Sequence, residues 1–251
     1  MATHNEEKNL ARCLDSVREL ADEIIIVDGE STDKTIEIAK KYNAKIFETT
    51  NKPIFHINKQ KAIDESQGNW ILQLDADEAL SAELKNEINL VIKSSSNFDG
   101  YWLPRRNYFL GKFLAKGGQY PDYTLRLYRK SKGHLPCQSV HEQATVEGKV
   151  GYLKGDLLHY PFPTFEAYLA KASRYAILLS AQYEERKVKT NFFAIFKYLI
   201  WFPKWTFFNL YFRHLGFMDG FPGFVFSLFS SIQIMMAYVL YWEKAHAKRI
   251  K

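Results

Sequence analysis

The feature that most constrains this fold is a pair of short apolar runs that each lead into an aspartate. Ile24-Ile25-Ile26-Val27 precedes Asp28, and Trp70-Ile71-Leu72-Gln73-Leu74 precedes Asp75. Runs of this length that are rich in β-branched or aromatic residues are typical of buried strands. Helical patterns separate the runs, and strands that alternate with helices predict an α/β fold with a mostly parallel sheet flanked by helices. Ligands bind at the carboxyl ends of such strands, so Asp28 and Asp75 are candidate site residues.

Apolar periodicity and capping signals predict the remaining elements. Asn5 is expected to cap a helix that carries Leu10, Leu14 and Val17 on one face. Residues 99–163 form short segments punctuated by glycine and proline, which predicts mixed strands and loops. The other predicted elements are helices over 31–42, 58–67, 84–91 and 164–189, and a strand over 45–48.

Charge and cysteine count limit the partners and the compartment. The net charge of +6 favours anionic partners, but no Lys/Arg-rich run or RNA-binding signature is present, so we predict no nucleic-acid partner. Cys13 and Cys137 lack metal-ligand spacing and are too few for a disulfide framework, which fits a reducing compartment. The first ten residues are polar and include Glu6 and Glu7, unlike a signal peptide. We therefore expect the protein to stay on the cytoplasmic side of the membrane.

Asp75-Ala76-Asp77 places two carboxylates two residues apart in the turn after the second apolar run. At this spacing both can face one divalent cation that bridges a diphosphate, because Mg²⁺ takes few protein carboxylates and completes its shell with phosphate oxygens. The alternative is that the two acids only precede a helix at Ser81 and stabilise its positive end. The upstream strand-end Asp28 makes us favour the binding interpretation.

Three segments occur in order within the first hundred residues: Ala2-Thr3-His4-Asn5-Glu6-Glu7, Val27-Asp28-Gly29-Glu30-Ser31-Thr32-Asp33-Lys34-Thr35 and Leu74-Asp75-Ala76-Asp77-Glu78. They resemble the Thr-x-Asn-Glu-Glu, Val-Asp-x-x-Ser-x-Asp-x-Thr and Asp-x-Asp motifs of family 2 glycosyltransferases. Four later segments are similar to the branch that includes lipopolysaccharide-core glucosyltransferases. These are Pro104-Arg105-Arg106-Asn107, Gly117-Gly118-Gln119-Tyr120-Pro121, Arg126-Leu127-Tyr128-Arg129 and Val140-His141-Glu142.

The resemblance implies a GT-A (Rossmann-like) fold, a nucleotide-diphosphate sugar donor with UDP-sugar in first place, Mg²⁺ or Mn²⁺, and inversion at the anomeric carbon. It also implies roles for the motif residues. Asp28 would contact the base or ribose, Asp75 the ribose or the metal, and Asp77 the metal. Asn5 and Glu7 of the opening motif would join the nucleotide-sugar site.

The expected domain division follows from the same resemblance and from the change in composition along the chain. A GT-A catalytic domain is expected over residues 1–163, with a donor-binding half over 1–100 and an acceptor half over 101–163. A helical, membrane-associating region is expected over residues 164–251.

The sequence departs from the family pattern in two places. Asp28 is followed by Gly29, where the family often has a second acid. An apolar strand usually precedes the Thr-x-Asn motif, and here Met1 stands almost inside that loop. Either this central strand is absent or the protein starts upstream. Without the strand, we expect apolar surface and backbone groups of its neighbours to be uncovered.

An inverting transfer needs a base that takes the proton of the acceptor hydroxyl, and Glu142 in the family's His-Glu pair is our candidate. His141 would orient the diphosphate or the leaving group. A structural histidine and an exposed loop glutamate are the alternative. One arginine from each of two pairs, Arg105-Arg106 and Arg126 with Arg129, is expected to reach the diphosphate or an anionic acceptor, with Arg126 assigned to the donor. The alternative for these arginines is solvation at a strand edge.

The C-terminal part of the chain is unusually aromatic from Phe192 to Phe212, and Phe221 to Trp242 contains no charged residue. Lysines and arginines are interspersed before this stretch and follow it, as in helices that lie among lipid headgroups. We predict interfacial membrane binding, with a spanning helix and a buried core helix as alternatives. A lipid-linked or lipopolysaccharide-core acceptor, and a peripheral or monotopic position at the inner membrane, would explain this composition.

The predicted function is therefore the transfer of a hexose, glucose in first place, to a lipid-linked or lipopolysaccharide-core acceptor. A polyprenyl-phosphate sugar synthase is the first alternative, because it would use the same catalytic half. A sugar-nucleotidyltransferase is disfavoured, since no Gly-rich phosphate loop with a lysine opens the chain. A catalytically inactive membrane adaptor is the third alternative, if the missing strand leaves the site incomplete.

Overall fold

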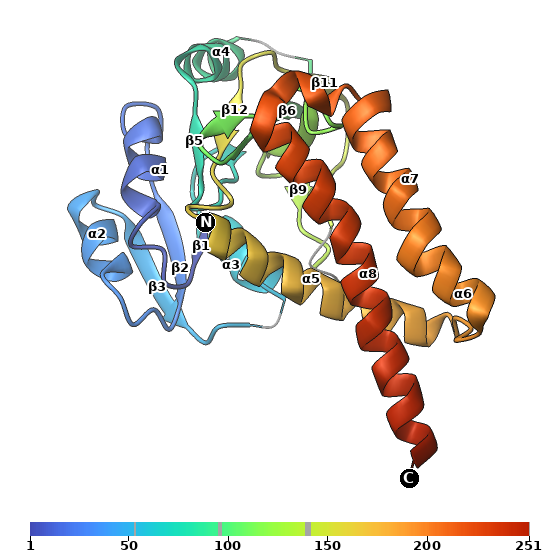
Figure 1. The fold of residues 1–251 in the computed structure, drawn as a ribbon. Coiled ribbons are helices and arrows are strands. Elements are labelled where there is room, and N and C mark those ends of the chain that lie inside the picture. The colour runs from blue at the N-terminus through green and yellow to red at the C-terminus, as the bar shows by residue number, and fades with distance from the viewer. Residues whose placement is uncertain (53, 95–96, 139–141, 251) are drawn as a thin grey trace. The chain divides into compact units, whose positions relative to one another are not determined.

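The computed structural model describes residues 1–52, 54–94, 97–138 and 142–250, and the chain forms two compact units (Figure 1). The first unit contains Met1–Arg106 and Asp122–His159. The second contains Asn107–Pro121 and Tyr160–Lys251.

The first unit is an α/β structure, which confirms the predicted class. Its helices are α1 (Leu10–Val17), α2 (Thr35–Lys41), α3 (His56–Asp64) and α4 (Ala82–Lys93). Its strands are β1 (Ala2–Thr3), β2 (Ile25–Gly29), β3 (Lys45–Thr49), β4 (Trp70–Leu72), β5 (Glu78–Leu80), β8 (Asp122–Arg129), β9 (Gly133–His134), β10 (Thr145–Val146), β11 (Val150–Tyr152), β12 (Leu157–His159) and most of β6 (Gly100–Phe109).

The strands of this unit are less parallel than the sequence predicts. The order β1-β2-β3 is parallel, with Thr3 opposite Asp28 and Asp28 opposite Glu48. The larger sheet has the order β4-β8-β6-β12-β5, in which β4 and β6 both run antiparallel to β8. The expectation of a mostly parallel sheet is therefore wrong for the larger sheet, because β4, the strand before Asp75, pairs antiparallel with β8 from the middle of the chain.

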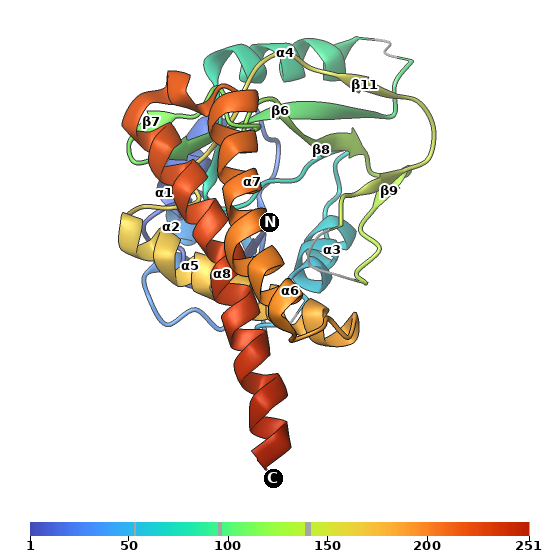
Figure 2. The same ribbon diagram turned by 45° about the vertical axis from the view of Figure 1, so that its right-hand side comes forward.

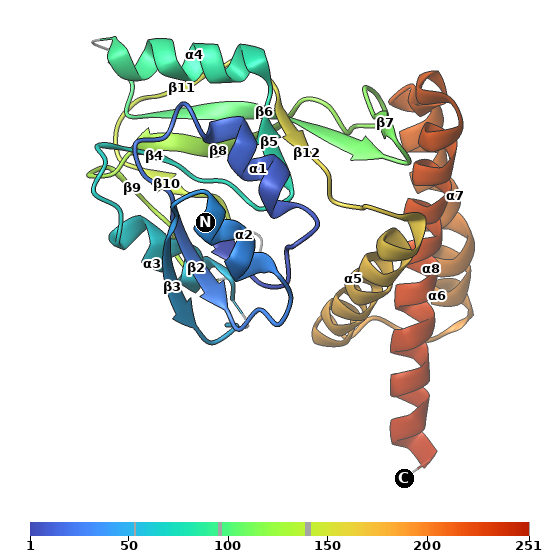
Figure 3. The ribbon, with the colours of Figure 1, turned by 90° about the vertical axis from the view of Figure 1, so that its left-hand side faces the viewer.

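Apolar faces hold the helices of the first unit against these strands. Leu10 and Leu14 of α1 are fully buried against Ile26 of β2. Leu84 and Ile88 of α4 pack into the core under β6, and α4 lies along β6 and β11 (Figure 3). The predicted helical faces are thus confirmed for both helices.

The start of α1 differs from the prediction. The helix begins at Leu10 and follows Asn9, which makes no side-chain cap bond. Asn5 has a positive φ of 55° and accepts a hydrogen bond from the Thr32 backbone N–H at 2.8 Å through its side-chain oxygen. Asn5 is therefore committed to a loop–loop contact, and the predicted helix cap is wrong.

A cavity of about 560 Å³ lies in the first unit beside the short β1 strand. Its lining includes Ile25 from β2, Ile71 from β4, Ala62 from α3 and Ile88 from α4. Met1 lines it as well, and its amino group donates to the Ile25 carbonyl oxygen at 2.7 Å.

The second unit is built mainly from helices (Figure 2). Its elements are β7 (Lys112–Phe113), α5 (Phe165–Glu185), α6 (Phe192–Phe196), the π-helix η1 (Lys197–Trp201), α7 (Phe202–Phe208), the π-helix η2 (Asn209–Arg213), the 3₁₀ helix η3 (Gly216–Asp219) and α8 (Gly220–Ile250). β7 pairs with the end of β6, where Tyr108 lies opposite Phe113. α8 packs against α5 and α7. α5 confirms the helix predicted over residues 164–189.

Thr164 caps α5 and accepts a hydrogen bond from the Ala167 N–H at 3.1 Å. Tyr168 of α5 is buried, whereas Tyr175 is 40% exposed. Ala176 and Tyr183 instead contact α8 in the apolar cluster that also contains Tyr238. The register of the buried face is set by packing on α8, which the spacing within α5 alone does not reveal.

Candidate active site

Asp28 lies buried at the end of β2 and holds two loops together. Its carboxylate accepts hydrogen bonds from Thr3 Oγ1 at 2.8 Å and from Ser31 Oγ at 2.6 Å. The Ser31 backbone N–H donates to the other oxygen at 2.8 Å. The first and second sequence motifs therefore meet at this carboxylate, as expected of residues that line one end of a parallel sheet.

Asn5 and Glu7 join the same pair of loops. Besides its bond from Thr32, Asn5 donates its backbone N–H to Ser31 Oγ at 2.8 Å. Glu7 accepts from the Lys34 N–H at 3.2 Å and donates its own N–H to Asp33 Oδ2 at 3.0 Å. The structure thus brings three of the predicted nucleotide-sugar residues, Asn5, Glu7 and Asp28, into one polar network.

Asp75 follows β4 and lies between two cations. Its carboxylate forms ion pairs with Lys59 and with Arg126 Nη2, the second at 2.7 Å. Arg126 Nη2 also binds Glu78 Oε1 at 2.8 Å, and Glu78 Oε2 accepts from the Asp75 N–H at 3.0 Å. Burial alone would raise the pKa of Asp75, but Arg126 and Lys59 hold it well below its usual range. Asp75 is therefore ionised and neutralised inside the protein.

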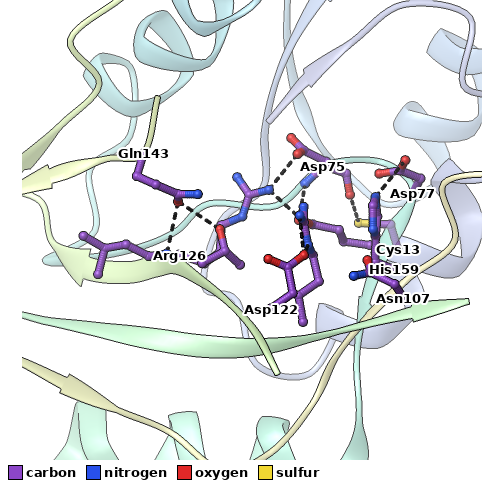
Figure 4. Close-up of polar contacts among 12 residues, drawn as sticks. Cys13, Asp75, Asp77, Asn107, Asp122, Arg126, Gln143 and His159 are labelled. Carbon is purple, nitrogen blue, oxygen red and sulfur yellow. Dashed lines mark hydrogen bonds and ion pairs between the residues drawn. The ribbon is translucent and has the colours of Figure 1, made fainter. Parts of the chain in front are cut away.

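Asp77 points away from that cluster, toward His159 (Figure 4). His159 Nε2 lies 3.4 Å from Asp77 Oδ2, and their side chains are 13% and 24% exposed. His159 is the last residue of β12 and lies opposite Glu78 of β5 in the antiparallel pairing of the two strands. Asp75 and Asp77 thus contact different partners, although only one residue separates them.

The Asp77–His159 pair is suited to a divalent cation. A carboxylate oxygen and an imidazole nitrogen are both ligands of Mn²⁺, and Mg²⁺ accepts one or two carboxylates together with phosphate oxygens. Among the described residues, no group of three or more His, Cys, Asp or Glu side chains could hold a metal by itself. Two protein ligands with a diphosphate supplying the rest therefore fit this position better than a closed protein site.

The arginine pairs are divided between this site and its surroundings. Arg126 is buried in the Asp75 cluster, and Arg105 Nη2 binds Asp122 Oδ2 at 2.7 Å while Nη1 lies 3.6 Å from Glu78. Arg106 and Arg129, by contrast, pair with Asp156 and Asp99 at 3.3 and 3.6 Å. One member of each predicted pair therefore reaches the acidic cluster.

Arg126 also has an unsatisfied donor. Its Nε is buried and finds no hydrogen-bond acceptor among the described residues. Burial would lower the pKa of the guanidinium, but Asp75 and Glu78 raise it further above its already high value. The charge of Arg126 is consequently fixed, and one of its N–H groups is left for another acceptor.

Glu142 lies against α3. Its carboxylate accepts from the Gln138 backbone N–H at 3.1 and 3.2 Å and lies 3.7 Å from His56 Nδ1. The neighbouring Gln143 fixes this segment to β8, since its Oε1 accepts from Thr124 Oγ1 at 3.0 Å. His141 falls outside the described residues.

Sequence reasoning missed three residues of this site: His56, Lys59 and His159. A signal was present for each of them. Lys59 shares a helical face with Ala62 and Ile63, so its burial could be predicted, and His56 lies one turn before it. His159 ends an apolar run, as Asp28 and Asp75 do.

The family model and the relatives in sequence indicate one family. The model of "Glycosyl transferase family 2" matches residues 1–144. An uncharacterized glycosyltransferase of Rickettsia prowazekii is 31% identical over 90% of this chain and 80% of its own length. The lipopolysaccharide core biosynthesis glycosyltransferase LpsC of Rhizobium meliloti is 29% identical over 94% of this chain and 90% of its own. Among solved structures, residues 1–349 of S. aureus TarS in complex with UDP align with a TM-score of 0.47 at 17% identity, over 86% of this chain and 72% of that one.

Proposed function

Because the chain belongs to glycosyl transferase family 2, we propose that it moves a hexose, glucose in first place, from a nucleotide-diphosphate sugar to a lipid-linked or lipopolysaccharide-core acceptor. Membership of the family makes the protein a glycosyltransferase. The similarity to LpsC, a lipopolysaccharide core biosynthesis glycosyltransferase, supports the choice of acceptor. A UDP-sugar is the donor that we propose first.

The observation that carries the proposal is the convergence of Asp77 and His159 beside the neutralised Asp75 cluster. The two side chains would hold Mg²⁺ or Mn²⁺, and the ion would neutralise part of the charge of the donor diphosphate. Lys59 and Arg126 cancel the charge of Asp75, so that carboxylate does not repel the diphosphate. The unmatched Arg126 Nε–H suits an oxygen of the bound donor.

The proposed reaction inverts the anomeric carbon. The acceptor hydroxyl oxygen forms a bond to the anomeric carbon while the bond from that carbon to the diphosphate oxygen breaks. Glu142 takes the hydroxyl proton, and the nucleoside diphosphate leaves with the electron pair. His56, 3.7 Å from Glu142, would orient the carboxylate, and His141 would contact the leaving diphosphate.

The acceptor and the place of the reaction are proposed together. A lipid-borne acceptor has to be reached at a membrane surface, so we place the enzyme at the cytoplasmic face of the inner membrane as a peripheral or monotopic protein. The aromatic and basic composition of the second unit supports this position.

A transfer assay tests the proposal. The full chain is incubated with radiolabelled UDP-, GDP- and ADP-hexoses, Mn²⁺ and either lipopolysaccharide with a truncated core or polyprenyl phosphate. We expect label from UDP-glucose in the lipopolysaccharide fraction only. Label in polyprenyl phosphate would favour the polyprenyl-phosphate sugar synthase. Donor binding without any transfer to either acceptor would favour the inactive adaptor.

A further inference from the structure

The second unit presents one face of a long helix that is apolar and exposed along its whole length. α6, η1, α7 and η2 continue one another from Phe192 to Arg213. The exposed large side chains on this stretch recur every three or four residues, which places them on one side of a helix. We call this surface the aromatic face, and its residues are Phe193, Phe196, Ile200, Trp201, Trp205, Phe208 and Phe212, each at least 41% exposed.

The opposite side of the same helix is used for packing within the unit. Tyr198 stacks on Tyr238 of α8 with ring centroids 4.9 Å apart, and Phe207 contacts Phe224 at 5.9 Å. Ala194 and Pro203 are buried. The helix is therefore held in the unit by one side, and the aromatic face contributes little to that packing.

The charge of this segment is strongly one-sided. Residues 186–218 contain six lysines and arginines and no aspartate or glutamate. Lys197 and Lys204 are exposed between the aromatic residues, and Lys197 Nζ lies 4.9 Å from the Phe202 ring centroid. A partner for this surface has to accept large apolar side chains and offer negative charge beside them.

We infer that the aromatic face lies in the headgroup region of an anionic lipid bilayer, with the axis of the helix along the membrane plane. Aromatic rings partition to the boundary between headgroups and acyl chains, while lysines extend to the phosphates. Each cation near an anionic membrane surface adds to the attraction. This inference rests on the proposed function, because a lipid-borne acceptor has to be reached at a membrane surface.

α8 is a less suitable membrane element, although it has the length. Among the described residues, Gly216–Ala247 is the one helix long and apolar enough to cross a membrane, and 33% of its most apolar stretch is buried. Ser227 and Ala237 are fully buried, and the helix packs on α5. α5 carries Glu166, Lys171, Arg174, Glu184 and Glu185, which the hydrocarbon core would exclude. α8 therefore supports the aromatic face from behind.

Vesicle binding tests the inference without any sugar transfer, so its outcome is independent of the proposed reaction. The full chain is sedimented with phosphatidylcholine vesicles that contain or lack phosphatidylglycerol. We expect binding to the anionic vesicles, and a loss of at least about tenfold in affinity for the double variant W201S/W205S, since two large apolar surfaces are removed from the contact. Y152S is the matched control, because Tyr152 is a 62% exposed aromatic residue of the first unit. It should bind within twofold of the parent.

Two further measurements make the result decisive. K197Q/K204Q should weaken binding to anionic vesicles and leave binding to neutral ones unchanged, and thermal unfolding of each variant should show that it is folded. Equal binding of W201S/W205S and the parent would overturn the inference. So would retention in the pellet after high salt and carbonate, because that is the behaviour of a spanning helix. The inference would also be overturned if the parent did not bind vesicles and formed a dimer that W201S/W205S converts to monomers. The aromatic face would then be the contact surface between two copies of the chain.

Discussion

The two units of this chain treat polar and apolar side chains in opposite ways. The first unit buries ionised groups and pairs them, with Glu78 and Arg126 almost without solvent contact. The second unit exposes large aromatic side chains, of which Phe193 is 79% accessible, and buries few polar ones. Burying charges is costly unless they are paired, so the first unit stabilises an arrangement of charges in advance of its ligand. The second unit leaves large apolar side chains exposed. The following changes test whether this division is real.

The largest expected effect concerns the chemistry of the first unit. Glu142→Gln removes the proposed base and keeps the shape of the side chain, so kcat should fall by about 10²–10⁴-fold. Donor affinity and the thermal midpoint should not change, because the substitution keeps the shape of the side chain and the proposed donor contacts lie at Asp77, His159 and Arg126. Steady-state kinetics at saturating donor would measure the effect. A drop of less than about tenfold would transfer the role to Asp122 or Asp156, which are the next candidates.

Breaking the buried charge cluster should have the next largest effect. Arg126→Met removes the cation shared by the fully buried Glu78 and the partly exposed Asp75, which keeps only Lys59, and losing one partner of a buried pair costs about 3–5 kcal/mol. Arg129→Met is the control, since Arg129 is more exposed and its pair with Asp99 is worth about 1 kcal/mol or less. Urea unfolding would give both values. Similar losses in the two variants would show that the first unit does not depend on its buried charges.

The pH dependence of the same cluster has a definite sign. The folded-state pKa of Asp75 lies below its unfolded value, so the carboxylate contributes stability that is complete above its ordinary pKa of about 4. This stability is lost as the pH falls through the folded-state pKa. Arg126→Met should therefore reduce the dependence of unfolding free energy on pH in the acid range. If Arg126→Met leaves this pH dependence unchanged in the acid range, other carboxylates determine it.

The proposed metal ligands should give a smaller change, limited to donor binding. Asp77→Ala and His159→Ala should each weaken Mn²⁺-dependent binding of UDP-sugar by about 10–100-fold, and the double variant should lose little more if both hold one ion. Calorimetric titration with and without Mn²⁺ would measure this. Both side chains are partly exposed, so the thermal midpoint should move little. Additive losses, or metal-independent binding in the parent, would contradict a shared site.

Local patterns predicted the helices and strand ends of the first unit well, because the spacing of apolar residues shows which face of an element is buried. Leu10, Leu14 and Asp28 lie where periodicity and strand ends place them. The remaining features depend on contacts between distant segments. Asn5 does not cap a helix because Thr32 uses its side chain, and Asp75 is neutralised by Arg126, which is 51 residues away. Such pairings have no signature in either segment alone.

The smallest expected effect concerns the cavity of the first unit, which is lined by Ile25, Ala62 and Ile71. Placing four apolar, β-branched residues before Met1 should extend β1 along β2 and fill part of this space. Burying each apolar side chain stabilises the folded state by about 1.5–3 kcal/mol, and ordering each added residue offsets most of this. The free energy of unfolding should therefore increase by about 1–2 kcal/mol.

A Gly-Ser extension of equal length is the matched control, because it moves the charged amino group without adding apolar side chains. Burial lowers the pKa of the Met1 amine to about 6, below its ordinary value near 8. Between pH 6 and 8 the unfolded chain therefore binds more protons than the folded one. The free energy of unfolding should increase steadily as the pH rises from 6 to 8. Both extensions should flatten this slope if they carry the amine out of the cavity. Only the apolar one should also raise the urea midpoint at pH 8, and equal midpoints for the two would mean that the cavity does not accept a strand.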